Sequence, residues 1–556
     1  MTTTNSNELV FVPLGGVGEI GMNFALYGFG SGKKREWIIV DCGVSFPGPD
    51  MPGADLVLPD ITFALSVLPQ IKAMIITHAH EDHYGAILSL WPKLKLPVYM
   101  TPFGAGMLES KAKGEHGAPE VPVTVYKAGE RFKVGVFEIE AISMAHSIPE
   151  PMALAIRTPA GTVVHTGDWK IDEAPAILPK TDENRLRQIG DEGVLALVCD
   201  STNAMREGSS PTEAAVAKGL AEVIGKATGR VAISTFSSNV GRIRSIAIAA
   251  AEVGRQVIVV GRSLKRVIDV ADELGYFDGI PAFLDEMEYG MVPRNKTVVL
   301  CTGSQGEPRA ALAKLAKGEM RNVTLNPDDT VVFSSRTIPG NERAILGIKN
   351  ALIDMGVKVV EDSDALVHVS GHPRRDELRQ MYSWVRPKIA VPVHGEAAHL
   401  TAHGLLALEC GVPKVGRVRN GDIFVFDAEN PVVIDQVQHG RHYKDGSVIG
   451  DEEQTGIADR RRLSFAGHVA ASVLLDDKGD LVDDVEIVCI GLPLEGIPGG
   501  MEKLLGVAAR GAVLSMPKRA RSDLDAVQES VRRSIRAAAE KAWGKKPVTT
   551  VFVVQL

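Results

Sequence analysis

Three histidines and two carboxylates follow a short apolar run early in the chain. The run Ala73–Ile76 is typical of a buried strand, and the segment that leaves it presents five polar side chains that can bind metal: His78, His80, Glu81, Asp82 and His83. In an extended segment alternate side chains point the same way, so His78 and His80 can face one ion. Asp82 and His83, at the turn into a helix, point elsewhere and can hold a second ion. The motif therefore predicts a fold with a metal site at the end of a buried strand.

The ligand types at this motif narrow the choice of metal. Imidazole nitrogens and carboxylate oxygens suit Zn²⁺, with Mn²⁺ as the next candidate. The alternative is a group of surface histidines at a strand end, but three histidines within six residues behind an apolar strand argue against it. The five cysteines are scattered singly, without a CxxC pair, so they predict neither a thiolate zinc site nor a disulfide framework. Such usage fits a reducing cytosol, and we expect a cytoplasmic protein.

The length and composition limit the class of protein. A chain of 556 residues is too long for one hydrophobic core, so we expect two to four domains. Charged residues, Gly or Pro interrupt every long apolar segment, so we expect no membrane span. The first eight residues have neither a basic start nor an apolar stretch, which argues against a secretory signal. A net charge of −8 does not exclude a nucleic-acid partner, because recognition needs only a local basic channel.

Further polar side chains stand where other apolar runs end. Four of them follow predicted strands in the first half of the chain: Asp41, His146, Asp168 and Asp200. Two later runs, 365–369 and 389–393, are predicted as strands that deliver three histidines: His368, His372 and His394. Taken singly, such a carboxylate is as well explained by a turn, and such a histidine by a satisfied loop position.

Helical and strand-like segments alternate between residues 207 and 357. This alternation predicts a parallel sheet with helices on its faces. Four loops that leave its strands are rich in small residues, and all but 302–307 contain an arginine: 235–242, 261–263, 302–307 and 334–342. Each loop alone is as readily explained by helix capping, but four on one side of a sheet favour a path for a polyanion.

The motif His78-x-His80-x-Asp82-His83 resembles the signature of the metallo-β-lactamase superfamily, whose hydrolases commonly use two metal ions. The late histidines that follow an α/β insertion resemble the β-CASP branch, whose members cut RNA or DNA, and within it the bacterial ribonuclease J family. The likeness spans nearly the whole chain. It implies an α/β fold: a metallo-β-lactamase αββα sandwich with an inserted β-CASP parallel-sheet α/β domain and a small C-terminal ββαβ domain.

With this resemblance, the chain divides into five parts. Residues 1–206 are the first part of the metallo-β-lactamase domain, 207–357 the β-CASP domain, 358–430 the return segment that completes the first domain, 431–462 a linker, and 463–556 the C-terminal α+β domain. The linker is expected because that stretch is dense in Gly and charged residues. The resemblance implies that the C-terminal domain assists self-association, as a homodimer or a homotetramer.

Carried over residue by residue, the resemblance assigns ligands to two divalent metal ions, Zn²⁺ first, with Mn²⁺ or Mg²⁺ as alternatives. One ion would be held by His78, His80 and His146, the other by Asp82, His83 and His394, with Asp168 shared between them. Asp41 would support the histidines without binding metal directly.

The resemblance also assigns the catalytic and substrate-binding groups. The segment that would contact the substrate phosphate is His368-Val369-Ser370-Gly371-His372. A water shared by two dications can attack phosphorus, and the departing 3′ oxygen then needs a proton from the far side. His372 would supply that proton, and Asp200 would orient His372. Arg374 and Arg375 stand where the family commonly has small or hydroxyl residues, and they could bind phosphate or cap the following helix.

The function that the resemblance implies is a two-metal ribonuclease acting on single-stranded RNA. We expect 5′-to-3′ exonuclease action with preference for 5′-monophosphate ends, an additional endonuclease action, and a role in RNA maturation and decay beside other RNA-decay factors. Two alternatives stay open: a DNA-directed β-CASP nuclease, and a catalytically silent RNA-binding subunit. The complete set of ligands counts against the silent subunit.

Overall fold

The structure is a computed structural model that describes residues 8–338, 340–493 and 495–556. Most of the N-terminal stretch discussed above, residues 1–7, therefore lies outside the described residues. The chain forms two compact units: residues 1–45 with 58–441, and residues 46–57 with 442–556. Across the described ranges, no helix is both long and apolar enough to cross a membrane.

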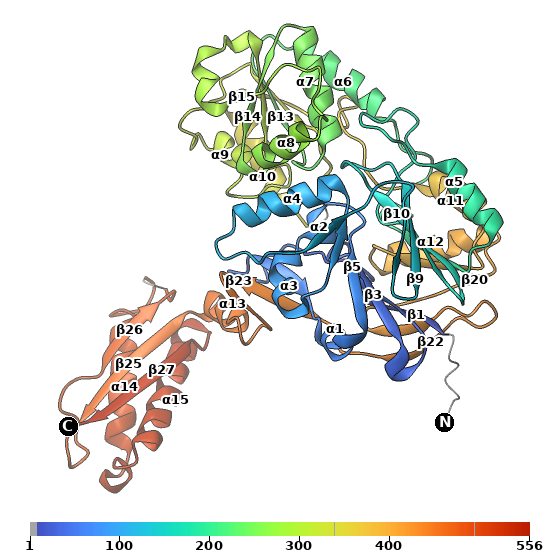
Figure 1. Cartoon of the computed structure of the whole chain (residues 1–556). Coiled ribbons are helices and arrows are strands. Elements are labelled where there is room, and N and C mark those ends of the chain that lie inside the picture. The colour runs from blue at the N-terminus through green and yellow to red at the C-terminus, as the bar shows by residue number, and fades with distance from the viewer. Residues whose placement is uncertain (1–7, 339, 494) are drawn as a thin grey trace. The chain divides into compact units, whose positions relative to one another are not determined.

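Two sheets packed face to face form the centre of the larger unit (Figure 1). The eight strands of the first sheet lie in the order β22 (Val432–Gln436), β21 (Asp422–Val425), β1 (Leu9–Gly15), β2 (Phe24–Phe29), β3 (Glu36–Val40), β5 (Ile71–Ile75), β6 (Val98–Met100) and β7 (Val123–Val125). The seven strands of the second lie in the order β20 (Lys414–Val415), β19 (Ile389–Val393), β12 (Ala196–Asp200), β11 (Gly161–His165), β10 (Met152–Thr158), β9 (Phe137–Ser143) and β8 (Arg131–Val134). Apolar side chains from both sheets share one buried core.

Helices complete the layers of the sandwich. Four α-helices lie between β4 (Leu56–Pro59) and β7 along the chain: α1 (Thr62–Ser66), α2 (Glu81–Tyr84), α3 (Ile87–Leu94) and α4 (Pro102–Lys113). The outer face of the second sheet is covered by α5 (Glu183–Glu192), α11 (Arg375–Val385) and α12 (Ala397–Glu409), whose apolar faces share a second buried core with it. The predicted αββα sandwich is therefore confirmed.

A separate parallel sheet of six strands follows the first part of the sandwich, as predicted. Its order is β15 (Leu284–Asp285), β14 (Gln256–Val260), β16 (Thr297–Cys301), β13 (Val231–Ser234), β17 (Thr330–Phe333) and β18 (Lys358–Val360). Its helices are α6 (Glu213–Lys226), α7 (Val240–Glu252), α8 (Arg262–Glu273), α9 (Ala311–Ala316) and α10 (Glu342–Asp354). Because all neighbouring strands run parallel, the four loops singled out above leave the same edge of the sheet. Pro339, in the last of these loops, lies outside the described residues.

The segment 365–369, predicted as a strand, is not in a sheet. Between β18 and α11 the chain contains no helix or strand, and every residue of that stretch is described. Side chains take the place of a neighbouring strand: the Val367 carbonyl accepts hydrogen bonds from Ser334 Oγ at 2.7 Å and from Arg242 Nη1 at 3.2 Å. An apolar pattern cannot distinguish this arrangement from a buried strand.

The smaller unit contains the C-terminal domain. Its strands are β25 (His468–Leu475), β26 (Glu486–Ile490) and β27 (Val548–Gln555), in the order β26-β25-β27, and its helices are α14 (Met501–Ser515) and α15 (Leu524–Trp543). The order along the chain is ββααβ, so the expected ββαβ order was wrong by one helix. The missed helix, α14, contains Gly506 and Gly511, which weaken its local helical signal.

The stretch 431–462, expected as a linker, contains regular structure. It includes β22, β23 (Arg441–Asp445) and β24 (Val448–Gly450), and α13 (Ile457–Ala466) begins within it. β22 pairs with β21 in the eight-stranded sheet, and β23 forms a hairpin with β24. The remaining strand, β4, covers Leu56–Pro59. The linker expectation was therefore wrong for this stretch, in which the charged and Gly-rich composition belongs to short strands at the surface.

Candidate metal centre

The segments that follow four strands bring the seven candidate ligands together. The segments after β5, β9, β11 and β19 supply two groups that share Asp168: His78, His80 and His146 in one, and Asp82, His83 and His394 in the other, with Asp82 and His83 on α2. In each group, the potential ligand atoms lie within 4.8 Å of one another. Parts of the chain more than 300 residues apart in sequence thus converge on one carboxylate, as strand ends in a two-sheet sandwich can.

Hydrogen bonds orient the histidines of the first group. Thr77 Oγ1 donates its proton to Asp41, so it accepts a hydrogen bond from His78 Nδ1 at 3.1 Å. His146 Nδ1 donates to the Gly371 carbonyl at 2.6 Å. Both rings therefore carry their lone pair on Nε2, and these atoms lie 3.8 and 3.7 Å from Asp168 Oδ2.

The remaining histidine of the first group, His80, completes this cluster. Its Nδ1 lies 3.1 Å from His78 Nε2 and 3.0 Å from His146 Nε2. Burial lowers the pKa of His80 to about 4 and holds the pKa values of His78 and His146 well below the ordinary range. The three rings are therefore neutral, the state in which imidazole binds metal.

Asp41 orients the second group. Its Oδ2 accepts a hydrogen bond from His83 Nδ1 at 2.7 Å, and its Oδ1 accepts one from the Thr77 amide at 2.8 Å. His83 Nε2 is thereby directed toward Asp168 Oδ2, 3.3 Å away. His394 Nδ1 lies 3.4 Å from Asp168 Oδ1. A carboxylate behind a histidine is the usual support for a metal ligand, which is the position expected for Asp41.

The surroundings of the shared carboxylate, Asp168, indicate that these residues can bind a metal. Asp168 is 3% exposed, and its Oδ1 has no hydrogen-bond donor among the described residues. Although burial favours the neutral acid, His394, His83 and His372 hold the pKa of Asp168 well below its usual range. Tetrahedral zinc with bonds near 2.05 Å needs ligand atoms about 3.3 Å apart, and the separations given above are mostly 3.0–3.8 Å. The nitrogen and oxygen donors therefore fit divalent cations such as zinc.

His372 stands beside both groups and is held by Asp200. Its Nδ1 donates to Asp200 Oδ2 at 2.7 Å and lies 3.9 Å from Asp168 Oδ2. Asp200 is fully buried, whereas the His372 side chain is 20% exposed and so remains open to a substrate. Burial disfavours the charged ring, but the Asp200 and Asp168 carboxylates outweigh it and raise the pKa of His372 to about 9. The ring is therefore protonated near neutral pH in the metal-free chain.

The segment 368–371 lies against the first group of histidines. A Cβ atom at Gly371 would come within 2.6 Å of the His146 ring, so only glycine fits there. Asn203 Nδ2 donates to Ser370 Oγ at 3.0 Å and to the His372 carbonyl at 3.1 Å. The Val369 side chain is buried, and His368 Nδ1 is a buried atom without a hydrogen-bond partner among the described residues. The segment is thus held in place beside the first group of histidines.

The two arginines after His372 differ in their surroundings. Arg375 forms ion pairs with Glu207 at 2.9 Å and Glu409 at 3.1 Å, and α11 begins at this residue. Arg374 is the N-cap residue of that helix, and its amide donates to Glu377 Oε2 at 2.9 Å. Arg375 is therefore engaged by two carboxylates where α11 begins.

A buried ionic network reaches Val367, the residue before the segment 368–372, and the sequence pattern did not predict it. Arg242, fully buried, donates to both carboxylate oxygens of Glu213 at 3.0–3.1 Å. Lys170 Nζ lies 3.4 Å from Glu213 and 2.8 Å from Asp172. Arg242 also donates to Ser334 Oγ at 2.7 Å. The network connects the loop that follows Asp168 to the start of α6, to α7 and to the segment before His368.

Comparisons with known families cover most of the chain. Residues 36–184 match a beta-lactamase superfamily domain, 228–352 the beta-CASP domain of ribonuclease J, 356–413 a Zn-dependent metallo-hydrolase RNA specificity domain, and 455–556 the ribonuclease J C-terminal domain.

Individual relatives match over almost the full length. The chain is 60% identical over 550 residues to ribonuclease J of Sinorhizobium meliloti, covering 99% of this chain and 98% of that protein. It is 36% identical to ribonuclease J of Mycolicibacterium smegmatis, covering 98% and 96%. It is 34% identical to ribonuclease J of Helicobacter pylori strain B128, covering 98% and 79%.

A solved structure shares the fold. The crystal structure of a protein of unknown function from Enterococcus faecalis superposes with a TM-score of 0.51 at 13% identity, covering 75% of this chain and 100% of that one. At this identity the likeness concerns the fold alone.

Proposed function

The chain belongs to the ribonuclease J family, and we propose that it is a 5′-to-3′ exoribonuclease that prefers 5′-monophosphate ends and also cuts internally. As a member of that family it is a metal-dependent ribonuclease of the β-CASP type. The observation that carries the finer proposal is the pair of ligand groups around Asp168, with the His372–Asp200 pair beside them. We propose single-stranded RNA as the substrate, the cytoplasm as the location, and RNA maturation and decay as the role.

The proposed cofactors are two divalent cations, Zn²⁺ first, with Mn²⁺ or Mg²⁺ as alternatives. His78, His80 and His146 would hold one, Asp82, His83 and His394 the other, and Asp168 would bind both. When bound, the cations would supply positive charge to the scissile phosphate and lower the pKa of a water molecule. Asp41 would keep the His83 ring in the tautomer that carries its lone pair on Nε2.

The chain's own side chains would complete the reaction. Because the Nδ1 proton of His372 is held by Asp200, the Nε2 proton is the one that the ring can give to the departing 3′ oxygen. The exposed edge of His372 makes that transfer accessible to a bound strand. Ser370 and His368 would contact the phosphate.

The direct test of the function compares the ends of one RNA. A single RNA is prepared with a 5′-monophosphate, a 5′-triphosphate or a 5′-hydroxyl, alongside the same sequence as single-stranded DNA. We expect early release of labelled mononucleotide from the 5′-monophosphate RNA, slower release from the other RNAs, and little from DNA. If the metal-loaded protein leaves 5′-monophosphate RNA intact, the proposal is wrong, and faster cleavage of DNA would favour the DNA-directed alternative.

Replacing His372 by Ala is expected to slow cleavage by about 10²–10⁴-fold while both cations remain bound. The protonated ring is the active form, so the wild-type rate should fall as the pH rises through the pKa of His372, about 9 without metal. Bound cations oppose the charged ring, so this fall should occur at or below that pH. In His372→Ala, the rate should no longer decrease as the pH rises through this range. Metal analysis together with a pH–rate profile provides the measurement, and a loss of metal from the variant would contradict the assigned role.

We propose that the C-terminal domain mediates self-association, as a homodimer or homotetramer. Residues of β25 that share one face of the sheet pair with Val488 and Ile490 on β26 and with Phe552 and Val554 on β27. All four of these partner side chains are exposed, whereas the opposite face packs on α14 and α15. Replacing Ile490 and Phe552 by Asp should shift the protein toward the monomer in light scattering, and an unchanged mass would exclude this face.

A further inference from the structure

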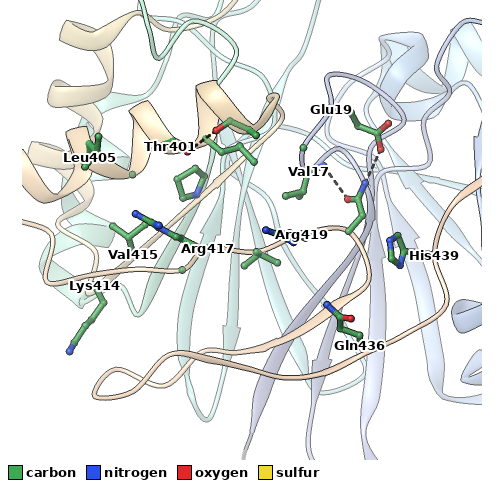
Figure 2. Close-up of a pocket in the computed structure, with 18 of the residues that line it drawn as sticks. Val17, Glu19, Thr401, Leu405, Lys414, Val415, Arg417, Arg419, Gln436 and His439 are labelled. Atoms are coloured by element: carbon green, nitrogen blue, oxygen red, sulfur yellow. Dashed lines mark hydrogen bonds between the residues drawn. The ribbon is translucent and has the colours of Figure 1, made fainter.

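A cavity of about 980 Å³ lies in the larger unit, and none of the seven candidate metal ligands is among the described residues that line it. Figure 2 shows its walls: α12, the chain from β20 to β21, and the turn that follows β1. One wall is aliphatic, with Leu400, Leu405 and Val415 facing the space. Its volume falls within the range of about 300–1,000 Å³ for small-molecule sites.

The lining of this cavity also carries positive charge without a matching carboxylate. Arg417 and Arg419 line it, and their side chains form no hydrogen bond or ion pair with any described residue. Among the described residues of the lining, Glu19 is the one carboxylate. It is already bound by Arg441 Nη2 and Asn420 Nδ2, each at 2.8 Å. The two arginines are therefore available to an anion.

The cavity shares a wall with the candidate metal centre. Val17 and Glu19 form isolated bridges with Gly395, and the His394 amide donates to the Gly16 carbonyl at 2.7 Å. The turn that lines the cavity therefore also contacts the backbone of a candidate ligand. Nucleic acid held at the metal centre and a group held in the cavity would be separated by this one layer of chain.

We propose that this cavity is a second nucleotide-binding site, in which Arg417 and Arg419 hold the phosphate and the aliphatic wall of α12 receives the base. One guanidinium group can donate two parallel hydrogen bonds to a phosphate, so arginines in the lining are well suited to hold one. An inorganic anion would fill a small part of the space, whereas a nucleotide also uses the apolar wall and the polar groups of Gln436 and His439. The occupant is either a free mononucleotide or a unit of a bound RNA strand.

The experiment compares R417Q/R419Q with a matched variant, K33Q/K34Q, which removes the same charge from exposed positions elsewhere. Binding of uridine 5′-monophosphate and of a 20-nucleotide single-stranded RNA is measured in chelator, so that no cleavage occurs, over a range of salt concentrations. For a single strand, each lost phosphate contact lowers the slope of log K against log salt by about 0.7.

If an RNA strand occupies the cavity, R417Q/R419Q should weaken RNA binding and, because one phosphate contact is lost, reduce the slope by about 0.7, while K33Q/K34Q behaves as wild type. If a free nucleotide occupies it, R417Q/R419Q should bind one fewer uridine monophosphate per chain, with RNA binding unchanged. The proposal is overturned if R417Q/R419Q matches K33Q/K34Q with both ligands. The conservative R417K/R419K variant keeps the charge, so its affinity for the ligand should lie between those of wild type and R417Q/R419Q. If R417Q/R419Q fails to fold, R417K/R419K takes its place in the comparison.

Discussion

Replacing His80 by Ala is expected to abolish RNA cleavage while leaving RNA binding intact. His80 Nδ1 lies 3.0–3.1 Å from the facing nitrogens of His146 and His78, so its removal takes one donor from the centre of the first ligand group. Substitution of a residue that only supports a metal ligand changes metal affinity or activity by about 10–100-fold. Loss of a ligand itself should have a larger effect. Cleavage of a labelled RNA, together with metal analysis, measures the effect.

A second histidine provides the control for this substitution. His116 is exposed and belongs to neither ligand group, so His116→Ala should retain both metal content and turnover. RNA binding in chelator should be equal for wild type, His80→Ala and His116→Ala. Unchanged turnover in His80→Ala would mean that the first group is not a catalytic metal site.

The candidate centre could be anticipated because its residues carry local signals. Each ligand follows an apolar strand, and parallel or sandwiched strands deliver their ends to a common edge. His78, Asp168 and His394 are far apart in sequence, yet each stands in the same setting after its strand. The resemblance to a family then supplied the grouping that single strand ends could not.

Other features lacked such signals. Arg242 and Glu213 both lie on helices, and nothing in their flanking residues distinguishes a buried charge pair from a solvated one. The segment 365–369 has the apolar pattern of a strand, but its backbone is bound by the side chains of Ser334 and Arg242. These interactions join parts of the chain that only the three-dimensional fold brings together, so a pattern read along the chain could not reveal them.

Replacing Arg242 by Met is expected to destabilise the larger unit by about 3–5 kcal/mol, the range for breaking a buried ion pair by removing one partner. Wild type buries two positive groups, Arg242 and Lys170, with two carboxylates, Glu213 and Asp172. The substitution leaves the carboxylates in excess and removes one of the two donors to the Val367 carbonyl, so that Ser334 Oγ remains. Denaturant unfolding, followed by hydrogen exchange at α6 and α7, measures the loss.

The double variant Glu213→Gln/Arg242→Met separates charge from packing. It restores equal numbers of buried positive and negative groups, so it should recover part of the stability lost in Arg242→Met. The Val367 carbonyl still lacks its arginine donor in the double variant. Because Val367 precedes the segment that would contact the substrate phosphate, we expect RNA cleavage to stay below wild type even where stability recovers. Full recovery of both stability and RNA cleavage would show that the network supports the fold alone. If stability does not recover at all, the packing of Arg242, rather than its charge, stabilises the unit.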